Sequence, residues 1–238
     1  MHIPDGILPA WLWISGFGLM AVFLAIALFR LRAMDRRRNI PLLGAVAAAM
    51  LVAMSLEILP LAYHLNLSVV AGILLGPSLG FTAAFIVNVM LALMGHGGIT
   101  VIGLNTILLG TEAVLGHTFF FFLPVRMPVF WRAAVATVLA LCAATLLLIA
   151  IVGISHVDSS LMEAGHEQVG SPVPPSAPER GSLVPFAVVV LSLGAIGWLI
   201  EGAITGAIIR FIARVKPDLL AHILHRQTCA GDAKRCPS

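Results

Sequence analysis

The chain has 238 residues, of which 60% are apolar and only 11% are charged, with a formal net charge of +3. Soluble domains are about half apolar and a quarter charged, so this composition excludes a soluble enzyme, a disordered regulator and a nucleic-acid-binding protein. The mean hydropathy of +1.03 indicates that lipid surrounds most of the chain.

Five apolar segments are long enough to cross a bilayer, which takes about 20 residues. In chain order they are Ile7–Phe29, Leu42–Ala62, Ile99–Leu123, Ala133–Ile154 and Leu183–Ile212. A further stretch, Leu65–Met94, is interrupted at Gly76-Pro77, where proline removes a backbone donor and disfavours a continuous helix. It is either one kinked helix or a short helix Leu65–Leu75 followed by Ser78–Met94, so six or seven spans remain open at this point.

The basic residues favour seven spans. All Lys and Arg residues except Arg180 fall in three groups: Arg30, Arg32, Arg36, Arg37 and Arg38; Arg126 and Arg132; and Arg210, Arg214, Lys216, Arg226, Lys234 and Arg235. Cytoplasmic loops carry an excess of such residues, and only seven crossings bring the three groups to one face. The sequence therefore predicts an all-α integral membrane protein with seven transmembrane helices, its N-terminus outside and its C-terminus cytoplasmic.

The whole chain, residues 1–238, is expected to form a single transmembrane domain. Its polar parts are an extracytoplasmic N-terminal segment (1–8), a proline-rich extracytoplasmic loop (155–181) and a cytoplasmic tail (213–238). The basic run follows the first apolar stretch, so no cleaved signal peptide is expected, and the bulky His2 disfavours removal of Met1. Two small-xxx-small patterns, Gly72–Gly76 and Gly202–Gly206, permit close helix approach inside the chain or with a partner.

The N-terminal sequence Met1-His2-Ile3-Pro4-Asp5-Gly6 predicts a metal site. The Met1 amine, the His2 amide and the His2 imidazole can close small chelate rings on one ion, and such nitrogen donors favour Ni(II) and Cu(II). His64 and His96 are predicted on the same outer face, where His64 can supply a fourth nitrogen. The alternative is a frayed terminus with incidental histidines.

Ionisable side chains inside membrane spans are costly, and they usually form pairs or carry function. The polar residues of the predicted spans are Glu57, Glu112, His117 and Glu201, with Asn88 and Asn105. The two asparagines are expected to bond between helices. Glu57, near the predicted outer end of its helix, is a candidate for orienting a ligating histidine. No sequence feature assigns a role to Glu112, His117 or Glu201.

The opening residues Met1 to Leu8 are similar to the start of the cobalt/nickel substrate-binding membrane subunits of the CbiM/NikM type, the S-components of energy-coupling factor (ECF) transporters. The resemblance continues through His64-Leu65 with Leu74-Leu75-Gly76-Pro77, through Gly97-Gly98-Ile99-Thr100 with Gly103-Leu104-Asn105, and through Glu201, Arg210-Phe211 and Lys216-Pro217-Asp218-Leu219-Leu220. It covers nearly the whole chain apart from Ser155–Arg180.

The resemblance implies that Met1, His2 and His64 hold the metal through the terminal amine, the His2 amide and two imidazoles. Asp5, Glu57 and Asn105 are additional candidates, and so is His96, which stands where many relatives carry Asp. The implied substrate is Ni(II) or Co(II), with no resident cofactor and no catalytic residues. The implied partners are a membrane coupling (T) subunit, cytoplasmic ABC-type ATPases and a small accessory membrane subunit, all at a bacterial cytoplasmic (inner) membrane.

The sequence contains no G-x-x-x-x-G-K-[ST] phosphate loop, so we expect no ATP hydrolysis by this chain. The favoured function is metal capture as one subunit of an ATP-driven importer. One alternative is a stand-alone, ion-coupled secondary transporter that uses Glu57, Glu112 and Glu201. A membrane scaffold without a substrate is a third possibility, and a membrane enzyme is the least expected because no nucleophile–base pair stands out.

Overall fold

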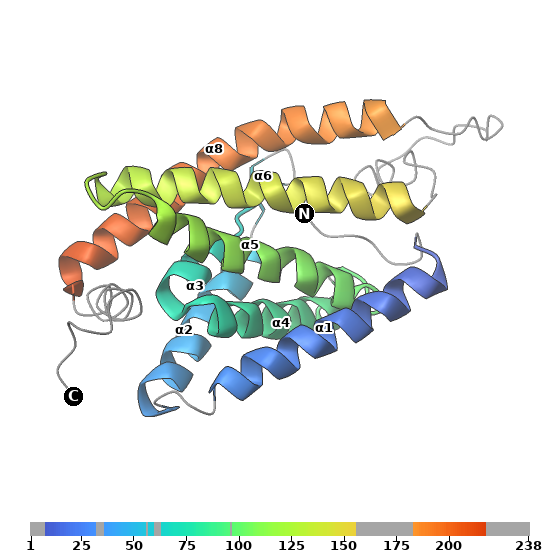
Figure 1. The fold of residues 1–238 in the computed structure, drawn as a ribbon, viewed down its shortest axis with the longest axis horizontal. Coiled ribbons are helices and arrows are strands. Elements are labelled where there is room, and N and C mark those ends of the chain that lie inside the picture. Colours follow the sequence, from blue (N-terminus) through green and yellow to red (C-terminus); the bar gives the residue numbers. More distant parts are fainter. Residues whose placement is uncertain are drawn as a thin grey trace.

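The computed structural model describes residues 8–31, 36–55, 57–59, 63–95, 97–155 and 183–217. These ranges contain seven helices and one two-stranded antiparallel sheet (Figure 1). The elements are α1 (Ala10–Leu31), α2 (Arg36–Ser55), β1 (Glu57–Leu59), β2 (Tyr63–His64), α3 (Ser68–Leu75), α4 (Pro77–Leu93), α5 (Ile102–Phe122), α6 (Val129–Ser155) and α8 (Leu183–Val215). The fold is that of a helical membrane protein, and the number of crossings and the orientation of the termini stay predictions.

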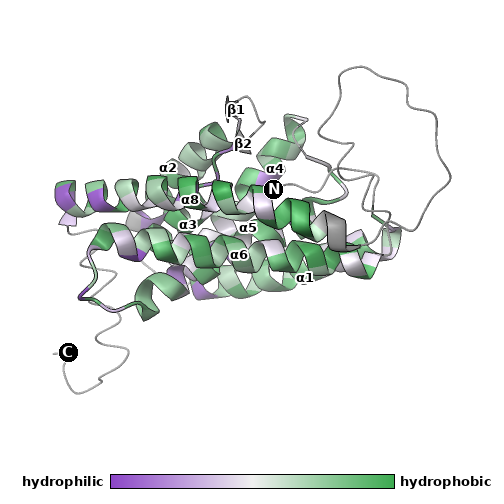
Figure 2. Cartoon of the chain, turned by 90° about the horizontal axis from the view of Figure 1, so that it is seen from above, coloured by the Kyte–Doolittle hydropathy of each residue, from purple (hydrophilic) through white to green (hydrophobic). Residues whose placement is uncertain are grey.

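Length and composition separate the helices into two groups. Ala10–Leu31, Val129–Ser155 and Ala187–Val215 are long and apolar enough to cross a bilayer, whereas the apolar helical stretches Asn39–Ser55 and Pro77–Leu93 are shorter. α5 lies in the interior, against α1, α3, α4 and α6, and α6 packs along α8 (Figure 1). Apolar residues cover most of the helix surfaces, as expected where the solvent is lipid (Figure 2).

The break at Gly76-Pro77 is confirmed as a turn between two helices. Gly76 has a φ of +82°, a conformation that residues with a Cβ rarely adopt, and its N–H donates to the Gly72 carbonyl at 2.9 Å. Pro77 then begins α4, where its missing N–H costs no helical hydrogen bond. With eight residues, α3 is about 12 Å long and too short to cross about 30 Å of hydrocarbon.

The predicted helix Leu42–Ala62 was wrong at its C-terminal end. α2 ends at Ser55, and the chain then forms β1 and β2, in which Glu57 lies opposite His64. The Ser55 hydroxyl donates to the Leu51 carbonyl at 2.6 Å, so the last turn binds one of its own carbonyls. Hydropathy does not distinguish a helix from a strand in a short apolar run, and for this reason the two strands were not predicted from the sequence.

Close helix contacts depend on glycine. A Cβ on Gly72 would lie 1.9 Å from the carbonyl oxygen of Ala113, so α3 and α5 touch backbone to backbone. A Cβ on Gly206 would lie 2.8 Å from the Phe130 carbonyl oxygen, which gives α8 and α6 a similar contact. Gly202 also faces α6, with its Cβ position 3.1 Å from a backbone oxygen. Both small-xxx-small patterns therefore serve packing inside the chain, apart from Gly76, which makes the turn.

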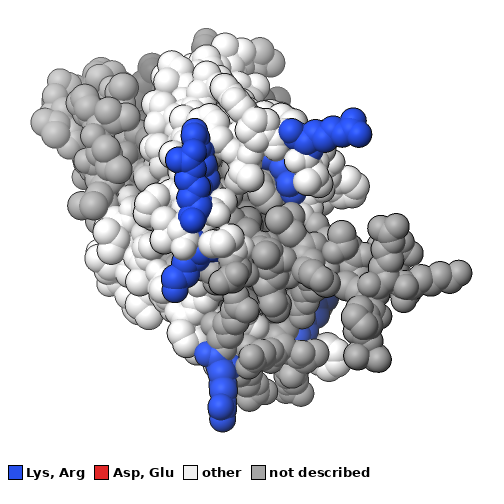
Figure 3. Space-filling view, turned by 90° about the vertical axis from the view of Figure 1, so that its left-hand side faces the viewer, with Lys and Arg blue, Asp and Glu red and all other residues white. Residues whose placement is uncertain are grey.

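Described basic residues from distant parts of the chain gather at one end of the bundle. Arg30 lies in the last turn of α1, Arg126 follows α5, and Arg214 lies in the last turn of α8. Figure 3 looks onto this end and shows Lys and Arg, with no described Asp or Glu on the same face. Groups far apart in the sequence thus share one end, as the charge pattern predicts for a cytoplasmic face.

Candidate functional site

A buried polar cluster lies inside the bundle, and four residues form it. They are Asn66, Ser68, Glu112 and Glu201, with exposed fractions of 7%, 0%, 6% and 2%. Glu112 comes from the middle of α5 and Glu201 from the middle of α8, while Asn66 and Ser68 belong to the segment that joins β2 to α3. The cluster therefore connects three parts of the chain that are distant in sequence.

Asn66 is the centre of this cluster. Its backbone N–H donates to Glu201 Oε1, and its Nδ2 donates to Glu112 Oε2. Its Oδ1 accepts from the Ser68 N–H at 2.9 Å and from the Ser68 hydroxyl, which fixes the start of α3. Two carboxylates at this depth are tolerated because each accepts a hydrogen bond from the same residue.

The cluster lies near mid-length of the long helices rather than beyond their ends. Glu112 is the central residue of Ile102–Phe122, and β1 and β2 lie near mid-length of the bundle in Figure 2. His64 was expected at the outer face, but Asn66, two residues later, lies at the level of the α5 centre, where it is bonded to Glu112. Non-helical backbone is tolerated at such depth only where protein or a polar cavity surrounds it.

His64 lies two residues before Asn66, at the end of β2. It is partly buried, and its Nδ1 atom is shielded from solvent. Residues directly opposite each other in an antiparallel pair have Cβ atoms about 5 Å apart, so Glu57 and His64 start from neighbouring points of the sheet. The structure therefore brings together Glu57 and His64, two of the residues that the sequence singled out.

The other polar residues of the spans have structural partners. Nδ1 of His117 lies 3.0 Å from the Gly72 carbonyl oxygen, and the His117 ring lies 4.4 Å from that of Phe121. Asn88 donates to the Ala84 carbonyl of its own helix at 3.1 Å, and not across helices as expected. Asn105 is buried in the first turn of α5, away from Glu112 at the centre of that helix.

Arg132 has a role that the sequence analysis missed. It was counted as a loop charge, but its side chain is 3% exposed and its Nε donates to the Phe120 carbonyl at 2.7 Å. The guanidinium carbon lies 4.2 Å from the centre of the Phe120 ring. Arg132 thus binds a carbonyl in the last turn of α5 and a ring beside it, which fixes the α5–α6 connection.

Several expected ligands lie outside the described residues, namely Met1, His2, Asp5 and His96. The neighbours of His96, Gly95 and Gly97, have φ values of +81° and +84°, as in a tight turn. Within the described ranges, no group of three or more His, Cys, Asp and Glu side chains is placed to hold a metal ion. Of the three main expected ligands, Met1, His2 and His64, the structure therefore describes only His64.

The sequence analysis also overlooked Asn66 and Ser68. A signal was present, because an Asn-x-Ser directly before the apolar run Val69–Leu75 is typical of a helix start. Asn66 and Ser68 also lie inside a predicted span, and polar residues in such a position usually have a bonding partner or a function.

Comparison with known proteins gives a consistent result. The family model CbiM, described as "Cobalt uptake substrate-specific transmembrane region", matches residues 2–219. A protein of Haloquadratum walsbyi named for metal transport is 30% identical over 247 residues, which covers 98% of this chain and all of that protein. A fused cobalt transport protein, CbiMQ, of Methanocorpusculum labreanum is 29% identical, and the match covers 94% of this chain but 37% of the fusion.

Two solved structures share the fold. The crystal structure of a transition metal transporter has a TM-score of 0.75 and 19% identity, with 96% of this chain and 98% of that chain covered. A truncated transition metal transporter has a TM-score of 0.70 and 18% identity, with 90% and 99% covered. The chain thus belongs to the CbiM family, and it is a membrane-embedded component of cobalt and metal uptake rather than an enzyme.

Proposed function

We propose that this chain captures Ni(II) or Co(II) as the substrate-binding subunit of an ATP-driven ECF-type importer. The ligands are the Met1 amine, the His2 amide nitrogen and imidazole, and the His64 imidazole. Four nitrogen donors of this kind suit square-planar Ni(II), and Co(II) also accepts nitrogen ligands. Family membership supports transport of a metal, and the N-terminal sequence supports this donor set.

The observation that carries the proposal is the anchoring of the segment next to His64. Asn66 is bonded to Glu112 and Glu201, so α5 and α8 hold the backbone two residues from the imidazole. Metal ligands bind tightly when surrounding groups fix their orientation before the ion arrives. Glu57 pairs with His64 in the sheet, and a carboxylate at that position is the residue type that commonly orients a metal-binding histidine.

The proposal needs partners that hydrolyse ATP. The sequence has no phosphate-binding loop, so separate cytoplasmic ATPases would drive transport through a membrane coupling (T) subunit, with a small accessory membrane subunit as a further partner. The relative from Methanocorpusculum labreanum is named as a fusion, which supports an association with a further transport component. The basic end of the bundle would face these partners in the bacterial cytoplasmic membrane.

Calorimetry with NiCl2 or CoCl2 on the purified full chain tests the proposal, after mass spectrometry has verified that the mature chain begins at Met1. His2→Ala, His64→Ala and a single residue added before Met1 are each expected to abolish high-affinity binding and the absorbance of square-planar nickel. His222→Ala is the matched control, since no role is assigned to that histidine. Unchanged affinity in the extended protein would contradict the proposed ligand set.

The buried carboxylates also support a second candidate, a stand-alone transporter coupled to an ion gradient. Glu112 and Glu201 lie at mid-length of the bundle, where carboxylates of coupled transporters commonly reside. Liposomes that contain only this chain would then accumulate radiolabelled metal in response to a proton gradient. Uptake only after the ATPases and the coupling subunit are added would refute this candidate and support the first.

A further inference from the structure

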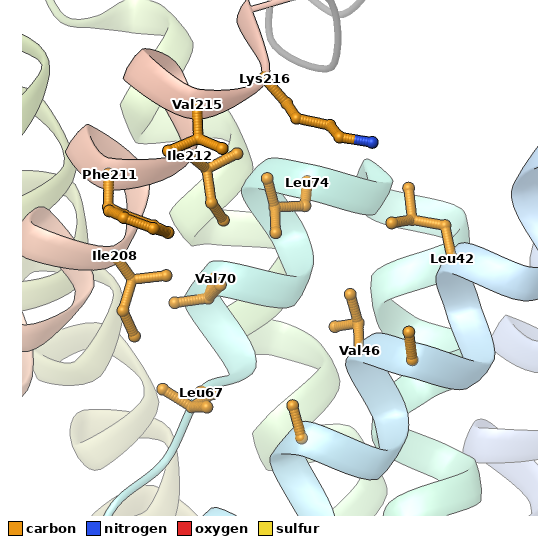
Figure 4. Close-up of a pocket in the computed structure, with 12 residues that line it drawn as sticks. Leu42, Val46, Leu67, Val70, Leu74, Ile208, Phe211, Ile212, Val215 and Lys216 are labelled. Atoms are coloured by element: carbon orange, nitrogen blue, oxygen red, sulfur yellow. The ribbon is translucent and has the colours of Figure 1, made fainter.

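An apolar groove lies on the outside of the bundle between α2 and α8, with α3 as its floor (Figure 4). Its volume is about 430 Å³. Val70 and Leu74 of α3 are buried at the floor, whereas Phe211 on the α8 side is 65% exposed. The lining residues Leu67, Val70 and Leu74 show that the floor of the groove follows the whole length of α3.

The charge at the groove is positive and lies at one end. Its lining is apolar except for Lys216, which follows α8 and extends over one end of the groove in Figure 4. This is the end of the bundle that carries Arg214 and the other described basic groups. Among the described residues that line the groove, none is acidic. This described lining therefore offers hydrocarbon walls and one cation at its polar end.

The chemistry of the groove favours a lipid chain as its occupant. Its described lining consists of aliphatic and aromatic side chains, with Lys216 at one end. A flexible acyl chain fits an open groove of hydrocarbon side chains on the lipid-facing surface of a membrane protein. An occupant that fills the groove and also pairs with Lys216 combines a hydrocarbon chain with an anion.

We propose that this groove binds one anionic phospholipid, with an acyl chain between α2 and α8 and its phosphate at Lys216. Basic pockets between helices on the cytoplasmic side of membrane proteins bind such headgroups, and one basic residue contributes about a five-fold preference for anionic over neutral lipid. The bound chain would complete the packing of α3 against α8, the helix that carries Glu201. None of the described lining residues is a proposed metal ligand.

Native mass spectrometry of the full chain tests this proposal, with phosphatidylglycerol and phosphatidylcholine of identical acyl chains offered in equal amounts. The wild-type protein should retain one phosphatidylglycerol in preference to phosphatidylcholine. Lys216→Gln should lower this preference about five-fold and leave retention of phosphatidylcholine unchanged. Ala49→Trp, which places a ring in the groove, should reduce retention of both lipids.

Matched control variants distinguish lipid binding in the groove from lipid binding elsewhere on the surface. Arg126→Gln removes an exposed charge from the same end of the bundle, and Val22→Trp adds a ring on the exposed face of α1, so both should behave as wild type. Thermal unfolding verifies that each variant is folded. An unchanged preference in Lys216→Gln, or full retention of both lipids in Ala49→Trp, would overturn the proposal. So would efficient cross-linking of Ala49→Cys to a protein helix, rather than to lipid, in the assembled membrane complex.

Discussion

The bond between Asn66 and Glu112 gives the sharpest test of the buried cluster. Asn66→Asp preserves the size of the side chain, the acceptor for Ser68 and the backbone bond to Glu201, but it removes the Nδ2 donor. A hydrogen bond to a charged group contributes about 1.5–3 kcal/mol. Two like charges about 4 Å apart at an effective dielectric constant of 20 add repulsion of up to about 4 kcal/mol, which is reduced if one carboxyl takes up a proton.

We therefore expect Asn66→Asp to lower the free energy of unfolding by about 3 kcal/mol. Because Asn66 holds the segment next to His64, nickel affinity should fall about 10- to 100-fold, as is usual when a residue that orients a metal ligand is lost. Adding Glu112→Gln to this variant restores a donor opposite the new carboxylate, with the two roles exchanged. The double variant should recover most of the stability and most of the affinity.

Thermal unfolding in detergent and nickel calorimetry measure the two effects in the same preparations. Glu112→Gln alone is the control, since it removes the charge but retains an oxygen that accepts from Asn66. If the double variant is no better than Asn66→Asp, the pair is not coupled and the cluster does not position the site. If stability recovers but nickel affinity does not, the cluster holds the fold without serving the metal.

Three further predictions concern the close contact of Gly72, the side chain of Arg132 and the effect of bound nickel on stability. Gly72→Ala should destabilise the protein by about 3 kcal/mol or more, because its Cβ would lie 1.9 Å from the Ala113 carbonyl oxygen. Gly18→Ala, with nothing within 4 Å of its Cβ, should leave the melting temperature unchanged or raise it. Arg132→Lys retains the charge but loses the planar contact with Phe120, and should cost about 1–3 kcal/mol in urea unfolding. Nickel at about 100 times its dissociation constant should raise the unfolding free energy by about 2.7 kcal/mol, and a chelator should abolish this gain in thermal scans.

The features that the sequence predicted correctly depend on local chemistry. The helix break at Gly76-Pro77 follows from the backbone properties of two adjacent residues. The clustering of Arg30, Arg126 and Arg214 at one end follows from the excess of basic residues in the loops on one side of a membrane protein. Neither prediction requires knowledge of which helices are neighbours.

The buried cluster was not predictable in the same way. Asn66 is 46 residues from Glu112 and 135 residues from Glu201, and no periodicity of a single segment brings them together. The hydropathy of the region around Glu57 indicated burial but not a strand, because an apolar run of a few residues fits either structure. The partner that a polar residue within a span finds thus depends on which helices surround it. The sequence alone does not reveal which helices are neighbours.

The bonds of Asn66 limit how this chain can move in the bilayer. They lie at the level of the α5 centre, where lipid offers no hydrogen bonds, so each polar group left there without a partner would cost several kcal/mol. Separating α5 from α8 would break at least one of the two bonds, because Asn66 cannot follow both helices. A rotation of the whole bundle within the membrane exposes none of these groups. The difference in cost favours movement of the helices as one rigid body over separation of α5 from α8.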